Sequence, residues 1–273
     1  MGTVDDTAMA KLPGGRRTNR FPEGPPKGAP MTKTSRVAVI SVLLIGVLCP
    51  PARVSAQQRP ALADKIAKTH GLDSFGQIDA IRYTFNIDAG PLKLSRSWIW
   101  EPKTGQISYD GKDKAGNPVK ITYSRSQIAS QSAVVKEEVD PAFFNDQYNL
   151  LFPYHLVWDT GATIQDAGMQ KLPLGQGSAQ KVVVKYSSDG GYTPGDTWNL
   201  FVDPDGRIQE LYFQHGGSAK PSVFIAAFND YKKAGPVLIA LDHRGTADGN
   251  PARVFFTNVA VKLVGSSTWT EAK

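Results

Sequence analysis

The most regular pattern in this chain is an alternation of apolar and polar residues that begins near residue 81. Ile81, Tyr83, Phe85 and Ile87 alternate with polar residues, which is typical of a strand with one buried face. Related patterns predict nine further strands, at 92–101, 106–110, 119–123, 180–187, 198–202, 207–215, 222–228, 237–244 and 253–264. Most of the connections are too short for the crossovers that parallel strands need, so we expect an antiparallel sheet.

Two segments break this alternation and predict helices. The first runs from Pro60 to Thr69, and His70-Gly71 is suited to ending it. The second runs from Pro141 to Phe152, with Asp140 as its N-cap and Pro153 as its stop. The predicted fold class is therefore mainly β (α+β): a single curved antiparallel sheet, a half-barrel of about ten strands, with two or three helices on its concave side.

A different hydrophobic pattern lies near the start of the chain. Lys33 and Arg36 precede an apolar run from Val37 to Cys49, and the small residues Val54-Ser55-Ala56 follow it. This order is that of a secretory signal peptide that is cleaved before Gln57. The run is too short to cross a hydrocarbon core of roughly 30 Å as a helix, so an uncleaved membrane anchor is the weaker alternative.

The chain is thus expected to have three parts. Residues 1–30, rich in Pro, Gly and Arg, predict a disordered extension or a misannotated start before Met31. Residues 31–56 are the predicted signal peptide, and residues 57–273 are expected to form a single β domain that is periplasmic or secreted. Cys49, the single cysteine of the sequence, lies in the apolar run, so the mature domain has neither a disulfide nor a thiol nucleophile.

Removal of the signal peptide also removes most of the basic excess. The whole chain has a formal net charge of +6, but eight of its 31 Lys and Arg and three of its 25 Asp and Glu precede Gln57. The mature domain therefore has a net charge of about +1. A balance this close to neutral argues against a nucleic-acid partner, and we expect at most transient membrane contact.

The familiar sequence motifs of hydrolases, metal sites and nucleotide sites are absent, so we expect no cofactor and no metal. A candidate polar cluster remains in two segments: His155 with Asp159, and Asp242 with His243 and Arg244. A histidine beside a carboxylate can serve as a general base. We favour the simpler interpretation, in which these residues stabilise strand ends, and we assign no catalytic residue.

Aromatic residues give the clearer indication of a ligand site. Trp98 and Trp100 are two positions apart in a predicted strand and so share one sheet face. Tyr148, Phe152 and Trp158 come from the predicted helix and the segment after it. Most such residues are simply core, but a concave sheet that is wider than its helices leaves apolar surface for a ligand. We therefore take these five residues as the candidate ligand-binding residues.

These features together resemble the outer-membrane lipoprotein carrier superfamily, the LolA/LolB-like periplasmic half-barrels, with this chain as a divergent member. The resemblance comes from the opening helix before His70-Gly71, the helical interruption of the meander, the hairpin from Trp198 to Ile208 and the stretch from Phe228 to Pro236. It implies a binding protein for a lipid, a lipoprotein acyl chain or another apolar small molecule. The alternatives are a hydrolase-like enzyme that uses the polar cluster and a non-catalytic scaffold domain.

Signal-peptide cleavage can be tested on secreted protein. We expect N-terminal sequencing to find a mature chain that starts at about Gln57, because the small-residue exit precedes it. A chain that lacks residues 1–30 should be exported equally well. A mature protein that begins upstream of Val37 would contradict the prediction.

Overall fold

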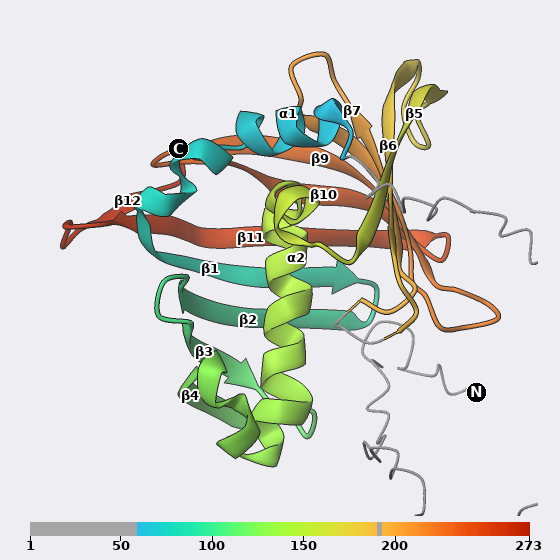
Figure 1. Ribbon diagram of the computed structural model, residues 1–273. Coiled ribbons are helices and arrows are strands. Elements are labelled where there is room, and N and C mark those ends of the chain that lie inside the picture. The colour runs from blue at the N-terminus through green and yellow to red at the C-terminus, as the bar shows by residue number, and fades with distance from the viewer. Residues whose placement is uncertain (1–58, 190–192) are drawn as a thin grey trace, which may run out of the picture. The chain divides into compact units, whose positions relative to one another are not determined.

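Alternating strands build one antiparallel sheet that curves around a central helix (Figure 1). The computed structural model describes residues 59–189 and 193–273, so the predicted extension and signal peptide lie outside the described residues. Within these residues the sheet has twelve strands, in the order β4-β3-β2-β1-β11-β10-β9-β8-β7-β6-β5, with β12 beside β11. The strands are β1 (Ile78–Ala89), β2 (Leu92–Glu101), β3 (Gln106–Lys112), β4 (Pro118–Ser124), β5 (Ala162–Lys171), β6 (Ser178–Tyr186), β7 (Thr197–Val202), β8 (Ile208–Gln214), β9 (Val223–Ala234), β10 (Val237–Ala247), β11 (Asn250–Leu263) and β12 (Trp269–Glu271).

The predicted fold class is confirmed, and all ten predicted strands are present. The two additional strands, β5 and β12, were missed for different reasons. β5 is an edge strand in which only Ile164 is buried, and its register shifts between Asp166 and Met169, so it lacks a period of two. β12 has three residues and pairs only with the end of β11, which leaves too short a pattern to recognise.

The helices lie on the concave side of the sheet (Figure 1). They are α1 (Ala61–Thr69), the 3₁₀ helices η1 (Leu72–Gln77) and η2 (Arg125–Ser130), the π-helix η3 (Val135–Val139) and α2 (Asp140–Trp158). α1 ends as expected, because Gly71 adopts a left-handed φ of 102°. A Cβ at Gly71 would lie 2.3 Å from the carbonyl oxygen of Pro236, so the close approach of these two segments also requires glycine.

Both predicted ends of the second helix are wrong. Asp140 does not cap α2, because η3 leads directly into it; instead its carboxylate accepts a hydrogen bond of 2.9 Å from the Tyr123 hydroxyl. Pro153 does not stop the helix, which continues to Trp158. The proline costs α2 one N–H donor and clashes with the preceding turn, and Leu151 takes up this distortion with φ −119° and ψ 21°. Burial of Tyr154, His155 and Leu156 then stabilises the last turn.

A buried ion pair fixes the middle of α2 to the sheet. The Asp146 carboxylate is 0% exposed and accepts hydrogen bonds of 2.8 Å from Arg96 Nε and from the Trp98 indole N–H. A second Arg96 nitrogen, Nη2, donates to the other carboxylate oxygen, so the pair is bidentate. Burial raises the pKa of Asp146, and the hydrogen bonds from Arg96 and Trp98 oppose this effect.

Two histidines are buried where α1 and α2 meet β9 and β10. His70 is 2% exposed and His243 is 1% exposed, and both line a cavity of about 10 Å³ together with Leu150 and Pro153 of α2. Nδ1 of His70 donates to the Ile66 carbonyl oxygen at 2.8 Å, which satisfies the end of α1 as expected. Within the described residues, His70 Nε2 and His243 Nδ1 have no hydrogen-bond partner. The cavity has room for no more than one water, which is too little to solvate a charged imidazole ring. Both rings therefore favour the neutral form.

Loss of the Asp146 carboxylate should destabilise the domain strongly. We expect Asp146→Asn to lower the free energy of unfolding by about 3–5 kcal/mol, because it leaves the Arg96 guanidinium without its buried partner. The matched control is Asp110→Asn, which breaks an exposed ion pair with Lys120 and should change stability by less than about 0.5 kcal/mol. Chemical denaturation measures both; equal effects would show that the buried pair does not hold α2.

The buried histidines should make the domain acid-sensitive. Burial lowers the pKa of His70 to about 4 and that of His243 to about 3, from 6.5. Below pH 6.5 the unfolded chain therefore binds two protons that the folded chain excludes. The free energy of unfolding then decreases as the pH is lowered, by up to about 3 kcal/mol per pH unit for the two histidines together. His243→Phe keeps a ring against Phe228 and should flatten the decline of Tm between pH 6.5 and 4.5.

The control for this experiment is His215→Gln, because the hydrogen bond that the His215 ring donates to the Asp196 carboxylate raises the pKa of His215. The stability that His215 contributes is present below its unfolded pKa and is lost as the pH rises. Its removal should not flatten the acid slope. An unchanged slope in His243→Phe would contradict the prediction.

Candidate functional site

The five predicted aromatic residues all lie in the layer between the sheet and α2. Trp98 is 1% exposed and Trp100 is half-buried, and both contact the Phe143 ring of α2 at centroid distances of 5.5 and 5.8 Å. On α2 itself, Tyr148 and Phe152 are buried, and Trp158 is half-buried at its end. α2 therefore separates the two tryptophans of β2 from strands β6 and β7.

Aromatic residues that the sequence reasoning did not single out join these five. Phe152 stacks on Trp198 of β7 at a centroid distance of 4.0 Å, and Phe75 of η1 contacts Trp158 at 4.8 Å. Trp198 could have been recognised, because it alternates with buried Leu200 and Val202 in a predicted strand. Phe75 gave no such signal, since it lies in a short 3₁₀ helix whose residues follow no regular pattern.

The apolar inner face of the sheet continues beyond α2. Ile87 of β1 lies opposite Leu94 of β2 on one side and Val254 of β11 on the other, and all three face inward. In the neighbouring row, Ala252, Gly245 and Ala226 lie side by side on β11, β10 and β9. These three residues have almost no side chain, and Ala252 and Ala226 are 5% and 0% exposed. This row of small, buried residues is here called the trough.

His155 and Asp159 meet in a buried hydrogen-bond network. Nδ1 of His155 lies 3.0 Å from Asp159 Oδ1, and its Nε2 lies 2.9 Å from Oε1 of Gln147. The second Asp159 oxygen, Oδ2, accepts hydrogen bonds of 2.7 Å from the hydroxyls of Tyr148 and Tyr186. The network therefore ties the end of α2 to β6.

Burial alone would raise the pKa of Asp159, but hydrogen bonds and charge from His155, together with hydrogen bonds from the two tyrosines, outweigh it and lower this pKa. Both ring nitrogens of His155 are engaged, and its side chain is 7% exposed. Such a histidine positions a helix end and has no free nitrogen with which to take a proton from a substrate.

The structure does not bring the other candidate polar residues into this network. Asp242 and His243 are consecutive on β10, so their side chains point to opposite sheet faces. Asp242 accepts hydrogen bonds from Arg253 (2.6 Å) and Arg244 (3.2 Å) on the outer face, whereas His243 stacks on Phe228 inside. Alternation thus places Asp242 and Arg244 away from His243, and the five residues form separate groups.

The described residues hold no cluster of three or more His, Cys, Asp and Glu side chains arranged as metal ligands. Over the same residues, no helix is both long and apolar enough to cross a membrane.

Neither known protein families nor curated proteins contain a match to this chain. Among solved structures, a DUF1329 family protein from Desulfovibrio piger matches with a TM-score of 0.40 and 11% identity, over 76% of this chain and 94% of that one. A LolA superfamily protein from Nitrosomonas europaea matches with a TM-score of 0.39 and 7% identity, over 72% and 92%. The lipoprotein LppX of Mycobacterium tuberculosis matches with a TM-score of 0.29 and 10% identity, over 74% and 96%.

The matches thus include a protein of the superfamily that the sequence resembles. At these TM-scores and identities, the likeness carries no argument about a ligand. The function has to be inferred from the residues of this chain.

Proposed function

We propose that this is an exported binding protein that holds an apolar ligand, such as an acyl chain, in the trough beside α2. The observation that supports this most directly is that the apolar inner face extends past α2 onto β1, β9, β10 and β11. An acyl chain is narrow enough to lie along a row of small residues and needs no charged partner.

The five predicted aromatic residues would then have two roles. Tyr148 and Phe152, which contact each other and Trp198, would line the ligand site on the α2 side. Trp98, Trp100 and Trp158 would support α2 in its position. Each aromatic side chain contributes on the order of 150–250 Å² of apolar surface, so few residues suffice to enclose a hydrocarbon chain.

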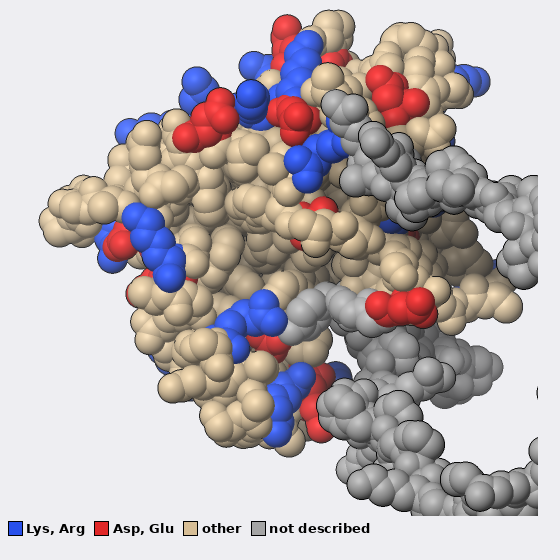
Figure 2. All heavy atoms as spheres, viewed as in Figure 1, with Lys and Arg blue, Asp and Glu red and all other residues tan. Residues whose placement is uncertain are grey.

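The charge distribution fits an uncharged ligand. Figure 2 shows that the Lys, Arg, Asp and Glu side chains gather around the periphery of the helix-bearing face, with a broad uncharged area between them. Among the carboxylates near α2, Asp146 pairs with Arg96, and Asp159 is hydrogen-bonded to His155 and Tyr148. An apolar ligand would therefore meet no unpaired charge that it would have to desolvate.

Binding of a dansyl-labelled fatty acid tests this proposal. We expect saturable fluorescence enhancement with the mature protein, and we expect Ala252→Leu to weaken it about tenfold, because the added side chain fills the trough. The matched control, Ala115→Leu, places the same side chain at an exposed turn between β3 and β4 and should bind normally. Tm measurements on both variants separate lost binding from lost folding.

Trp100→Ala tests the supporting role. It should lower binding far more than it lowers Tm, because α2 would no longer be held in its position beside the ligand. A loss of several kcal/mol of stability as the main effect would show that Trp100 is only core. If the unmodified protein does not bind the fatty acid, the proposed function is wrong. Normal binding by Ala252→Leu would place the ligand elsewhere.

A further inference from the structure

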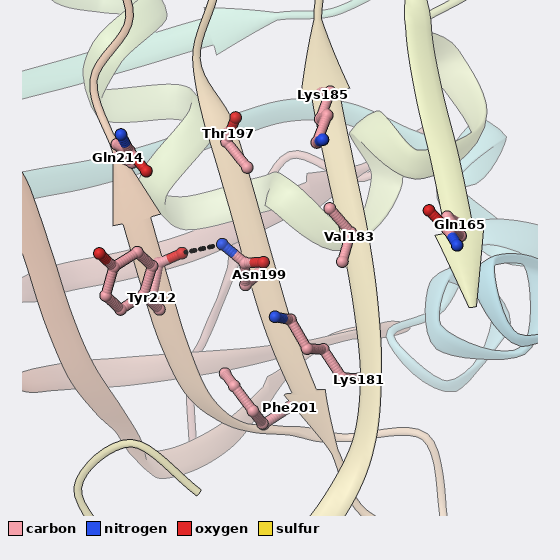
Figure 3. A pocket seen from close by; sticks show the side chains of 9 residues that line it. All are labelled: Gln165, Lys181, Val183, Lys185, Thr197, Asn199, Phe201, Tyr212 and Gln214. Atoms are coloured by element: carbon pink, nitrogen blue, oxygen red, sulfur yellow. Dashed lines mark hydrogen bonds between the residues drawn. The ribbon is translucent and has the colours of Figure 1, made fainter. Parts of the chain in front are cut away.

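A second groove lies on the opposite face of the sheet, away from α2 (Figure 3). Its volume is about 530 Å³, within the range of sites for small molecules, and its lining comes from β5, β6, β7 and β8. The buried neighbours Val182, Val184, Trp198 and Leu200 face the core. Strand alternation therefore directs the residues between them outward, into the groove.

Strand register arranges the lining in rows. In the first row, Lys185 of β6 pairs with Thr197 of β7, which pairs with Gln214 of β8. In the second row, Val183, two residues earlier on β6, pairs with Asn199. In the next row Lys181 lies opposite Phe201. The groove thus presents amide and hydroxyl groups in its middle and a lysine towards each end.

The groove is cationic. Within the described residues, neither Lys181 nor Lys185 forms an ion pair, whereas Lys93 and Lys120 each pair with an aspartate. No Asp or Glu is among the residues that line the groove. The nearest candidate in the register, Glu210 beside Phe201, is buried and accepts a hydrogen bond of 2.7 Å from the Leu174 backbone N–H instead.

The middle of the groove is held in a fixed orientation. Asn199 is 8% exposed, and its Nδ2 donates to the Tyr212 carbonyl oxygen at 3.0 Å, which sets the direction of the side-chain amide (Figure 3). Phe201 is 5% exposed and supplies apolar surface beneath Lys181, whose amine lies 5.8 Å from the ring centroid. Ordered amide groups beside aromatic surface are suited to a ligand with both hydroxyl groups and C–H faces.

We propose that this groove binds an acidic saccharide of two or three sugar units. Lys181 and Lys185 are four residues apart on β6, so their Cα atoms are separated by about 13 Å. This spacing fits two carboxylates on successive or alternate sugars better than one compact anion. Thr197, Asn199 and Gln214 would hydrogen-bond the ring hydroxyls between them. The site is on the other sheet face from the trough, so it is independent of acyl-chain binding.

Isothermal titration calorimetry of the mature protein at low salt tests this proposal with three probes. Trigalacturonate should bind saturably, the neutral trisaccharide galactotriose should bind at least about tenfold more weakly, and inorganic phosphate should not compete. Lys181→Gln with Lys185→Gln should reduce trigalacturonate affinity about tenfold or more with little change in Tm, because Lys185 is exposed, Lys181 is only partly buried and neither forms an ion pair among the described residues. Thr197→Val, which removes one hydroxyl at constant volume, should weaken both saccharides.

The matched control is Lys93→Gln with Lys120→Gln, which removes the same charge at the other end of the sheet and should leave affinity unchanged. An equal loss in this control would show general electrostatic attraction and overturn the site. The proposal is also overturned if galactotriose binds as well as trigalacturonate, if phosphate displaces it, or if none of the probes binds. Fatty-acid binding should be normal in the Lys181/Lys185 variant, so failure of either site is distinguishable.

Discussion

The ion pair between Asp146 and Arg96 is the contact on which the arrangement of this domain depends. The apolar residues of α2 follow no single face of the helix, so hydrophobic burial alone would hold it against the sheet in many orientations. A bidentate pair has one geometry, and a buried carboxylate that loses it is left uncompensated. The Trp98 indole donates to the same carboxylate, so the pair also fixes the first ring of the aromatic layer. The position of α2 then decides which part of the inner face is covered and which part forms the trough.

Much of the sheet could be predicted from the sequence because the relevant signal is local. Every second residue of a strand faces the same side of the sheet, whichever strands lie beside it. The apolar residues from Ile81 to Ile87 therefore identify the buried face before the neighbouring strands are known. Helix ends were harder to predict, because the local preference competes with packing. Pro153 and Asp140 are good local signals for a helix stop and a helix start, yet burial of Tyr154 and the lead-in from η3 outweigh them.

The candidate polar residues could be predicted only in part. His155 and Asp159 are one helical turn apart, so their contact follows from the sequence once the helix is known to continue past Pro153. Asp146 and Gln147 are neighbours on α2, but Asp146 bonds to Arg96 and Gln147 to His155. Tyr186 reaches Asp159 from β6. Nothing local in the sequence indicates these partners. For Asp242 and His243, closeness in sequence was misleading. Consecutive residues of a strand point to opposite faces of the sheet, so the two side chains do not meet.

The order of the strands leaves β4 and β5 at the edges of an open sheet. An edge strand exposes unpaired backbone groups, which can pair with another copy of the chain. Both edges here carry features that oppose such pairing. β5 is irregular between Asp166 and Met169, where Gly168 has a φ of 70°, and β4 begins at Pro118 and bears the exposed Lys120. A domain without disulfides can therefore expose a wide sheet during folding and still resist aggregation through its edges.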